Sequence, residues 1–577
     1  MRSHLIRRAI YPLLEAGSSY IPSQASRKFS TAIAVSHNVE LPPANLYVNP
    51  ICMQMDKMIL KAATPEDVLT ILVTHRGALF VQNLITAMEL LADMSSRQVP
   101  FSVSQKMRFP EQYEEVQKDK LLADPRYSLL ISDLIEYSSK MDIRSIQTIM
   151  ESLQSLNHCH YKLFGALLRR LYSMDIPESE ISAAISIGSS LEWGGFGQAE
   201  TFFNRLSDLL IPNMQSLSSL DLINGVVIYS KLPKLYPDLL NHFAESAIPR
   251  LDTFSNQHIG FISMALTVYG GENFPAVRSA TVRAADILSG SRELAPELRD
   301  LVRVAVSLRR TNICHENFLK YAIEQSVKQL DIAATQRERM DPSIATISDL
   351  AQLMDTCAHF GLSSPGLISS KILPHIQDNV DVVTEESAIR ILYSLARFPS
   401  ELSPSSVPIT NLLIRKIGGT SSTCWEKHKM KLMFIWFSKC MQFPTSIDSE
   451  IRKFILDKCL NHYLIARRGY TVPFPEDSEI LWTQVKDAGL VSEKTPQLNA
   501  YIPNSPFHAD ILIPEHRLAI LVLSQFDARD PMRPVGTDAL QCELIRSLGW
   551  EVYPFDRKCI RKKDEKILNT IRKLVDS

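Results

Sequence analysis

Four basic or titratable side chains recur at one position of a repeated pattern in the middle of the chain. They are Lys231, His359, Arg397 and Lys439, and each follows a small residue near the end of an apolar, helix-like segment. Side chains of this kind aligned along one edge could bind successive phosphates of a nucleic-acid strand. The helix dipole also favours a cation in the last turn, by about 0.3–1 kcal/mol, whether or not anything binds. Both explanations of this basic column remain open.

Aromatic residues lie beside the basic column in the sequence. Tyr229, Phe360 and Phe398 are neighbours or near neighbours of its members. Bases of single-stranded RNA stack on rings of this kind. For each residue taken alone, packing between helices is the simpler explanation.

A second group of basic side chains lies close to the end of the sequence. It consists of Arg557, Lys558, Arg561, Lys562, Lys563 and Lys566. The interspersed acids are Asp556, Asp564 and Glu565, so this stretch is positive although the whole chain has a formal net charge of −1. We predict that the first four basic residues contact an RNA backbone, and the alternative is an ordinary solvated helix face.

Asp510 is the one candidate for metal-assisted hydrolysis that the sequence offers. Nuclease chemistry of this type needs two carboxylates on adjacent strands to hold a divalent metal, with a lysine near the attacking water. The next strand carries Leu521 and Leu523 where the second acid and the lysine would stand. We therefore predict no catalytic residue, and a structural role for Asp510 in bonding the adjoining turn.

Cysteine and histidine spacing predicts no metal site, and no cofactor is expected. The nine cysteines form no CxxC pair, and the nearest approaches to ligand clusters are His158-Cys-His160 and Cys314-His315. Neither has the second pair of ligands that a zinc site requires. The stretch Gly194-Gly195-Phe-Gly197 is too short for a phosphate-binding loop.

These residues must be positioned by a long helical body. From Leu129 to about Leu464 helical periodicity dominates, and a short phrase recurs; two of its copies place Ala358 and Ala396 38 positions apart. Prolines that suit the first position of a helix, Pro237 and Pro275, recur at the same interval. The pattern predicts stacked helical hairpins. Their second helices are expected at Asp238–Ile248, Ala276–Leu288, Phe318–Leu330, Gly366–Ile376, Ile409–Ile417 and Asp448–Leu464, with earlier pairs at Ile146–Tyr172 and Ile181–Leu210 and an inserted loop at Ala333–Ser348.

A small α/β module is predicted behind the helical body. His508–Ile513 and Leu518–Leu523 read as two strands of a hairpin around a polar turn. After a polar loop (Ser524–Gly536), Thr537 could cap a helix that Gly549 ends. The remaining elements are a strand at Trp550–Phe555, a preceding helix at Ser478–Ala488 and a following basic helix at Lys563–Val575.

The segment Leu540–Phe555, taken with the Asp510 strand and the apolar strand after it, resembles a RAP domain. This restriction-endonuclease-like module stands at the C-terminus of organellar RNA-binding proteins, and the resemblance covers about the last seventy residues. Its most specific part is Leu548-Gly549-Trp550-x-Val552 and the distance of that step from Asp510. The family's Glu-x-Asp-Gly stretch is replaced by Leu521-Val-Leu-Ser524. The helical period resembles heptatricopeptide or octotricopeptide repeats, which often precede a RAP domain.

The beginning of the sequence differs in kind from the rest. Met1–Phe29 is rich in Arg and Ser and nearly free of acids, as in mitochondrial transit peptides. No run of eighteen apolar residues predicts a membrane span. We therefore expect a mainly α protein in four regions: a transit peptide at 1–29, a linker with irregular helices at 30–120, an α-solenoid of helical hairpins at 121–470, and a RAP-like α/β domain at 471–577.

The resemblance implies a non-catalytic RNA-binding protein of the mitochondrial matrix. Its expected roles are RNA stability or processing, or rRNA binding as a mitoribosome component, with single-stranded or ribosomal RNA and mitoribosomal proteins as partners and no DNA. Two alternatives stay open: an RNA endonuclease with an atypical site, and a helical scaffold that binds polypeptide.

Overall fold

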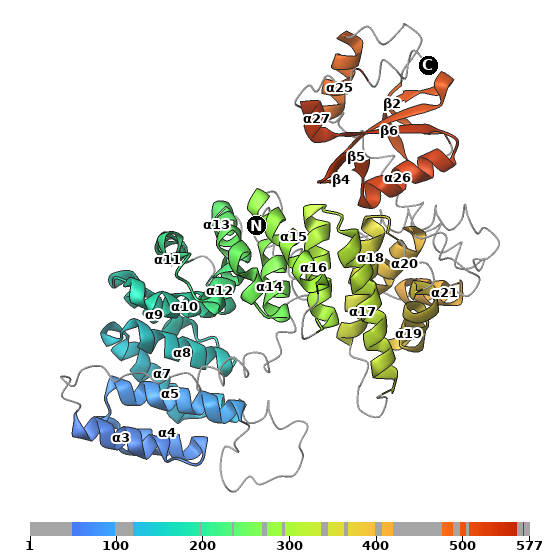
Figure 1. Ribbon diagram of the computed structural model, residues 1–577. Helices are drawn as coiled ribbons and strands as arrows, with labels where there is room; N and C mark the ends of the chain where they lie inside the picture. Colours follow the sequence, from blue (N-terminus) through green and yellow to red (C-terminus); the bar gives the residue numbers. More distant parts are fainter. Residues whose placement is uncertain are drawn as a thin grey trace. The chain divides into compact units, whose positions relative to one another are not determined.

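The protein is described here from a computed structural model, in which the described part of the chain is mainly helical and includes a small β-sheet near the C-terminus (Figure 1). The described residues are 49–97, 119–196, 199–232, 236–267, 274–290, 295–335, 344–362, 367–397, 407–418, 476–487, 497–503, 507–561 and 569. The predicted transit peptide lies outside them. Contacts divide the chain into two compact units, Met1–Tyr137 and Ser138–Ser577. None of the described helices has the length and apolar character needed to cross a membrane.

The first unit contains helices, three of which are regular α-helices within the region 30–120 where the sequence predicted irregular ones. They are α3 (Pro50–Leu60), α4 (Pro65–Thr74), the 3-10 helix η1 (Arg76–Ala78), α5 (Val81–Ser96) and α7 (Pro125–Tyr137). Thr64 and Asp67 form a reciprocal capping box at the start of α4, and Pro65 takes the first helical position. Arg76 of η1 pairs with Asp133 of α7 at 2.5 Å, so the last helix is tied to the others.

The second unit begins with a long series of helices. They are η3 (Ser138–Lys140), α8 (Ile143–Ser155), α9 (Tyr161–Ser173), η4 (Glu178–Glu180), α10 (Ile181–Trp193), α11 (Glu200–Asn213), α12 (Ser219–Ser230), α13 (Pro237–Ala247), η5 (Ile248–Thr253), α14 (Asn256–Leu266), α15 (Pro275–Ser289), α16 (Leu298–Thr311), α17 (Glu316–Thr335), α18 (Ile344–His359), the π-helix η7 (Ile368–Ile372), α19 (Leu373–Asp378), η8 (Val380–Val382), α20 (Glu385–Arg397) and α21 (Val407–Gly418).

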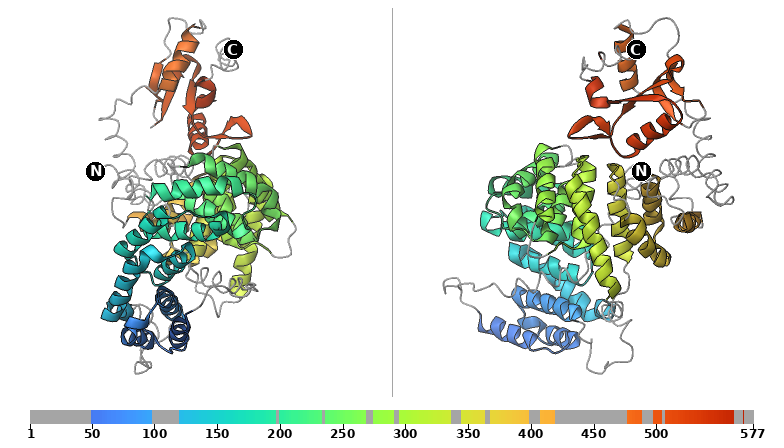
Figure 2. Two further views of the ribbon diagram at one scale, coloured as in Figure 1. Left: turned by 90° about the vertical axis from the view of Figure 1, so that its left-hand side faces the viewer. Right: turned by 45° about the vertical axis from the view of Figure 1, so that its right-hand side comes forward.

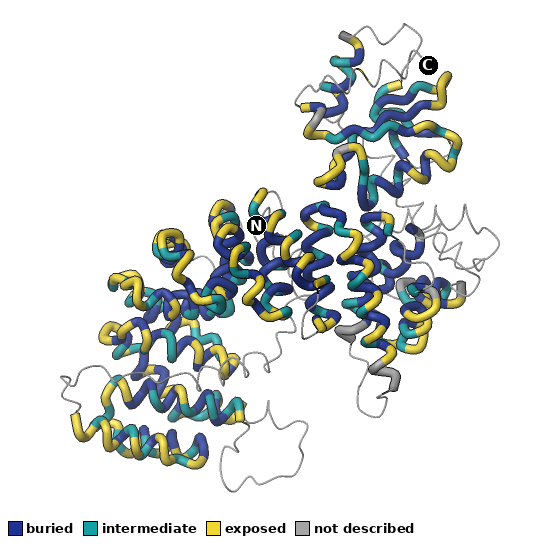
Figure 3. Tube along the Cα trace, in the orientation of Figure 1, coloured by how far each residue is buried: buried dark blue, intermediate teal, exposed yellow. Residues whose placement is uncertain are grey.

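The longer helices of this series form two rows, because each packs against the helix two positions further along the chain. The first row starts at α8 and the second at α9. Contacts run from α8 through α10, α12, α14, α16 and α18 to α20, and a second row runs from α9 through α11, α13 and α15 to α17. The helices therefore follow one another in sequence order in both views of Figure 2. Figure 3 shows the buried residues gathered where neighbouring helices meet. This is the packing that helical hairpins need, because one hairpin cannot bury its own apolar face.

The predicted second helices are confirmed where they are described. Pro237 and Pro275 stand at the first position of α13 and α15, as their spacing indicated. Asp448–Leu464 lies outside the described residues. The bounds of the predicted inserted loop, Ala333–Ser348, were too wide, because α17 continues to Thr335 and α18 begins at Ile344; residues 336–343 lie outside the described residues.

Basic side chains connect consecutive hairpins by hydrogen bonds to backbone carbonyls. Arg205 donates to the carbonyl oxygen of Leu171 at 3.0 Å, across 34 positions of the sequence. Arg250 reaches Leu217 at 2.6 Å across 33 positions. Lys416 reaches Val380 at 2.7 Å across 36 positions. These separations match one hairpin, so the same kind of contact recurs along the array.

The last part of the second unit is an α/β module. Its elements are α25 (Glu476–Asp487), β1 (Gln497–Tyr501), β2 (His508–Ile513), the 3-10 helix η12 (Pro514–His516), β3 (Leu518–Leu523), β4 (Phe526–Asp527), β5 (Asp530–Pro534), α26 (Gly536–Ser547), β6 (Glu551–Asp556) and α27 (Arg557–Arg561). The main sheet has the order β1-β2-β3-β6, with β2 antiparallel and β6 parallel to β3. The β3–α26–β6 crossover supplies the parallel pair.

Most of the predicted module is confirmed, with three corrections. The strands β2 and β3 have the predicted bounds, β6 is shifted by one residue, and Gly549 ends α26 with φ +82°. Thr537 does not cap α26, because the helix already begins at Gly536 and Val535 is its N-cap residue. The predicted polar loop contains the β4–β5 hairpin, and β1 was not predicted at all. The predicted basic helix Lys563–Val575 falls almost wholly outside the described residues.

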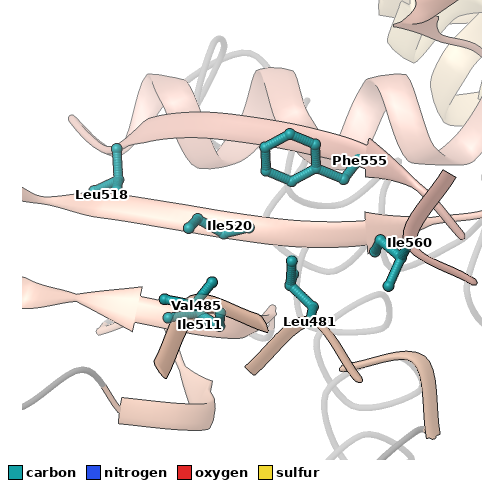
Figure 4. Packing of buried hydrophobic residues seen from close by; sticks show 7 residues of the cluster. All are labelled: Leu481, Val485, Ile511, Leu518, Ile520, Phe555 and Ile560. Carbon is teal, nitrogen blue, oxygen red and sulfur yellow. The ribbon is translucent and has the colours of Figure 1, made fainter. Parts of the chain in front are cut away.

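One face of the sheet packs against α25 and α27 (Figure 4). Alternate strand residues share this face because side chains alternate along a strand. The core consists of Leu481, Val485, Ile511, Leu518, Ile520, Phe555 and Ile560. The other face of the sheet is also buried, by strand residues that alternate with these: Ala519, Leu521 and Val552.

Replacing Gly260 in α14 by alanine should weaken the packing of α14 on α16. An added Cβ would lie 3.2 Å from Cα and 3.3 Å from the carbonyl oxygen of Asp300, and backbone atoms cannot move aside cheaply. We expect the free energy of unfolding to fall by about 1–3 kcal/mol, measured by urea denaturation. Gly165→Ala in α9 is the matched control. Its Cβ would meet nothing nearer than 3.9 Å, so higher helix propensity should stabilise it by up to about 1 kcal/mol. Equal effects of the two variants would contradict the close approach.

Candidate nucleic-acid interface

The described members of the basic column all lie at the C-terminal ends of first-row helices. Lys231 is the C-cap residue of α12, and His359 and Arg397 are the last residues of α18 and α20. We call the C-terminal ends of α10, α12, α16, α18 and α20 the helix-end edge. Lys439 lies outside the described residues.

Each of the three side chains contacts the preceding helix of the same row. Lys231 Nζ lies 2.6 Å from Glu192 Oε2 near the end of α10. The Nε2 atom of His359 lies 3.0 Å from Oδ1 of Asn312, the C-cap residue of α16. Arg397 donates from Nε to the carbonyl oxygen of Ala358 at 3.1 Å. The predicted register is therefore correct, but the side chains connect one helix end to the next.

The module contacts the same helix-end edge at α16, α18 and α20. Arg397 forms an ion pair with Glu543 of α26 at 2.5 Å, and its side chain is only 4% exposed. A side chain on Gly536 would collide with the His359 ring, which shows how closely the start of α26 approaches α18. Figure 1 shows α26 beside the end of α18. The expectation of an exposed column is therefore wrong at Arg397 and His359, since both are engaged in internal contacts.

The β4–β5 hairpin contacts the carbonyl ends of these helices. The backbone N–H of Ala528 donates to the carbonyl oxygen of Asn312 at 2.7 Å. Arg529 and Arg533 donate to the carbonyl oxygens of Cys314 at 3.3 Å and Phe360 at 3.0 Å. Asn312 and Phe360 directly follow α16 and α18, where the helix dipole favours cations and donors, whereas Cys314 lies between α16 and α17.

Two of the aromatic residues beside the column are core residues. Tyr229 is 1% exposed and its hydroxyl donates to the carbonyl oxygen of Phe203 at 2.8 Å. Phe360 is 2% exposed and its ring meets His359 edge-on. Neither ring is open to a base, and Phe398 lies outside the described residues.

The second basic group lies at the start of α27. Arg557 and Arg561 both pair with Asp477, at 2.8 and 2.5 Å, and their side chains are 46% and 58% exposed. Lys558 is exposed as well. Asp477 itself is buried, so two exposed arginines pair with a carboxylate that solvent barely reaches, and Lys558 lies next to Arg557 in the sequence. Lys562 lies outside the described residues.

Asp510 is fully engaged in hydrogen bonds within the module. Oδ2 accepts from the backbone N–H of Val522 at 2.7 Å, just past the last backbone pairing of β2 and β3, and Oδ1 accepts from the Ser478 hydroxyl of α25. Burial raises the pKa of the Asp510 carboxyl, while the Ser478 and Val522 bonds and the charge of Arg557 oppose that rise. Its hydrogen-bond partners are a strand and a helix, where the sequence predicted the adjoining turn.

The comparisons with known proteins were made against family models and curated sequences. No family model matches the chain, and no significant match to a curated protein was found.

Among the residues that the structure describes, no three or more His, Cys, Asp or Glu side chains gather so that they could hold a metal ion. Sequence reasoning missed Arg529 and Arg533, which were assigned to a polar loop. The prolines at 531 and 534 favoured that interpretation, although proline is tolerated on short edge strands. The signal that could have identified them is the pair of Asx-type turns at Asp527 and Asp530, whose carboxylates accept from Arg529 N and Met532 N at 3.0 Å.

Replacing Arg397 by alanine should loosen the module from the helix-end edge. The change removes a buried guanidinium with two partners, and we expect a loss of about 1–3 kcal/mol, since Glu543 is half exposed. Hydrogen exchange of the β4–β5 hairpin amides should accelerate. Glu543→Gln, which keeps a hydrogen-bond acceptor, is the matched control and should have the smaller effect. Unchanged exchange in Arg397→Ala would contradict the docking contact.

Replacing Asp510 by alanine should destabilise the module without altering RNA affinity. The buried N–H of Val522 would lose its acceptor, which costs about 1–3 kcal/mol. Urea denaturation measures this loss, and Asp510→Asn, which retains one acceptor oxygen, should lose less. Manganese-dependent RNA cleavage by the wild type that Asp510→Ala abolishes would contradict the structural role.

Proposed function

We propose that this protein binds RNA without cleaving it. The carrying observation is the exposed basic group at the start of α27, formed by Lys558 together with Arg557 and Arg561, both of which pair with the buried carboxylate of Asp477. On a chain with a formal net charge of −1, a local cationic surface is what an RNA backbone requires.

The proposal includes the identity of both parts of the second unit. We infer that the helical rows are a solenoid of heptatricopeptide or octotricopeptide type and that the module is a RAP domain. Support comes from the alternating helix contacts, from inter-hairpin bonds one repeat apart, and from the agreement of β2, β3, α26 and β6 with the segment that resembles this domain.

The cellular setting rests on the sequence of Met1–Phe29. Its Arg and Ser content supports import into the mitochondrial matrix. There the protein would act in organellar RNA stability or processing, or as an rRNA-binding component of the mitoribosome beside mitoribosomal proteins. The engagement of both Asp510 oxygens supports binding without hydrolysis.

Salt dependence and charge removal test the proposal together. We expect the purified protein to bind a labelled, mixed-sequence single-stranded RNA of about twenty nucleotides, with affinity that falls steeply as salt rises. Lys558→Ala should weaken binding and reduce the slope of log affinity against log salt by roughly 0.7, the value for one phosphate contact on a single strand. Fluorescence anisotropy provides both quantities. Lys558 is the first choice because Asp477 keeps both of its arginine partners in that variant.

A triple variant, Arg557→Ala with Lys558→Ala and Arg561→Ala, should show a larger loss, and thermal unfolding must check that it stays folded. The control variant carries Lys57→Ala, Lys61→Ala and Arg97→Ala, which removes the same charge from exposed positions of the first unit. Equal losses in both triple variants would mean a nonspecific charge effect. Absence of RNA binding by the wild type would refute the proposal and favour a polypeptide-binding scaffold.

A further inference from the structure

Two short motifs that the proposed function leaves unused lie against each other. The His158-Cys-His160 segment precedes α9, and the Gly194-Gly195-Phe196 turn follows α10. The Cys159 thiol donates from Sγ to the carbonyl oxygen of Gly194 at 3.3 Å, across 35 positions of the sequence. The start of α9 and the end of α10 therefore form one surface.

A series of aromatic rings leads from the core to solvent at this surface. Phe164 is fully buried, and Phe196 stacks on it with centroids 5.3 Å apart and planes 5° apart. Tyr161 follows at 5.8 Å from Phe196 and is 71% exposed. The most exposed large ring among the described residues is thus supported from behind by a rigid stack.

The glycines make this arrangement possible. Gly195 has φ +79°, which reverses the chain so that the N–H of Phe196 donates to the carbonyl oxygen of Leu191 at 2.8 Å. A Cβ on Gly194 would lie 3.1 Å from the Phe164 ring. The turn therefore holds Phe196 over Phe164, and Gly194 packs closely against the Phe164 ring.

The polar groups around Tyr161 suit a nucleotide. His158 and His160 lie 5.6 Å apart edge to face, and burial lowers the pKa of both imidazoles. Nδ1 of His160 accepts from the N–H of Leu163 at 3.2 Å, which places the ring proton on Nε2. Lys162 is exposed next to Tyr161, and its charge also lowers the pKa of His160.

We propose that Tyr161 is a stacking platform for one unpaired base of single-stranded RNA. The imidazoles of His158 and His160 face the polar edge of the base, and Lys162 contacts a neighbouring phosphate. A base is favoured over an apolar peptide because the exposed ring is flanked by a cation and polar rings instead of an apolar groove. This site rests on the proposed RNA binding and adds to it a contact on α9 that the basic residues do not indicate.

Replacing the exposed ring tests the platform without disturbing the core. Tyr161→Ala should weaken binding of a labelled single-stranded RNA about tenfold, within the range for loss of one base stack. Tyr161→Phe should restore most of the affinity, because it keeps the ring. Tyr172→Ala is the matched control: Tyr172 lies in the same helix and is 40% exposed. Its removal should leave the affinity at the wild-type value.

Two further measurements separate the possible results. Binding of duplex RNA should be insensitive to Tyr161→Ala, because paired bases cannot stack on the ring. A 4-thiouridine oligonucleotide should crosslink to the peptide that contains Tyr161. Wild-type binding that Tyr161→Ala leaves unchanged would overturn the platform alone and assign this surface to a polypeptide. Failure of the wild type to bind any RNA would overturn the proposed function with it.

Discussion

The packing of each helix end against the equivalent end one hairpin earlier is the constraint on which the second unit depends. An isolated pair of short helices exposes one apolar face, and only a neighbouring pair can bury it. First-row contacts from α8 to α20 meet this need. The bonds of Lys231 to Glu192 and of Arg397 to Ala358 fix the same register at the level of single side chains.

The same constraint explains why the helix-end edge attracts other groups. The helices α10, α12, α16, α18 and α20 present their last carbonyls at this edge, and the helix dipole makes that end of each helix negative. Basic residues in the last turn of these helices interact favourably with this negative charge. Arg529 and Arg533 of the module do the same through hydrogen bonds to backbone carbonyls. A basic column read from sequence is thus ambiguous in principle, because the features that would attract a phosphate backbone also stabilise helix ends and internal docking.

The sequence predicted the features that depend on neighbouring residues, such as helix starts and strand lengths. Pro237 and Pro275 mark helix starts because their missing N–H is not needed there, and the apolar runs of β2 and β3 have the length of buried strands. The partner of Arg397 was beyond reach, since Glu543 is 146 positions away and no pattern links the two. The stack under Tyr161 was hidden for the same reason, because its rings come from α9 and from a glycine turn more than thirty positions further along the chain.

The docking contacts also have a consequence for biosynthesis. Arg529 and Cys314 meet across 215 positions, so translation delivers the whole helical array before the β4–β5 hairpin exists. During that interval the nascent chain presents the ends of α16, α18 and α20 uncovered, with Arg397 still lacking its carboxylate. Closing so large a loop costs little more entropy than closing one of half the size, because the cost rises with the logarithm of length. The contacts between the module and the ends of α16, α18 and α20 are therefore among the last that the chain can form.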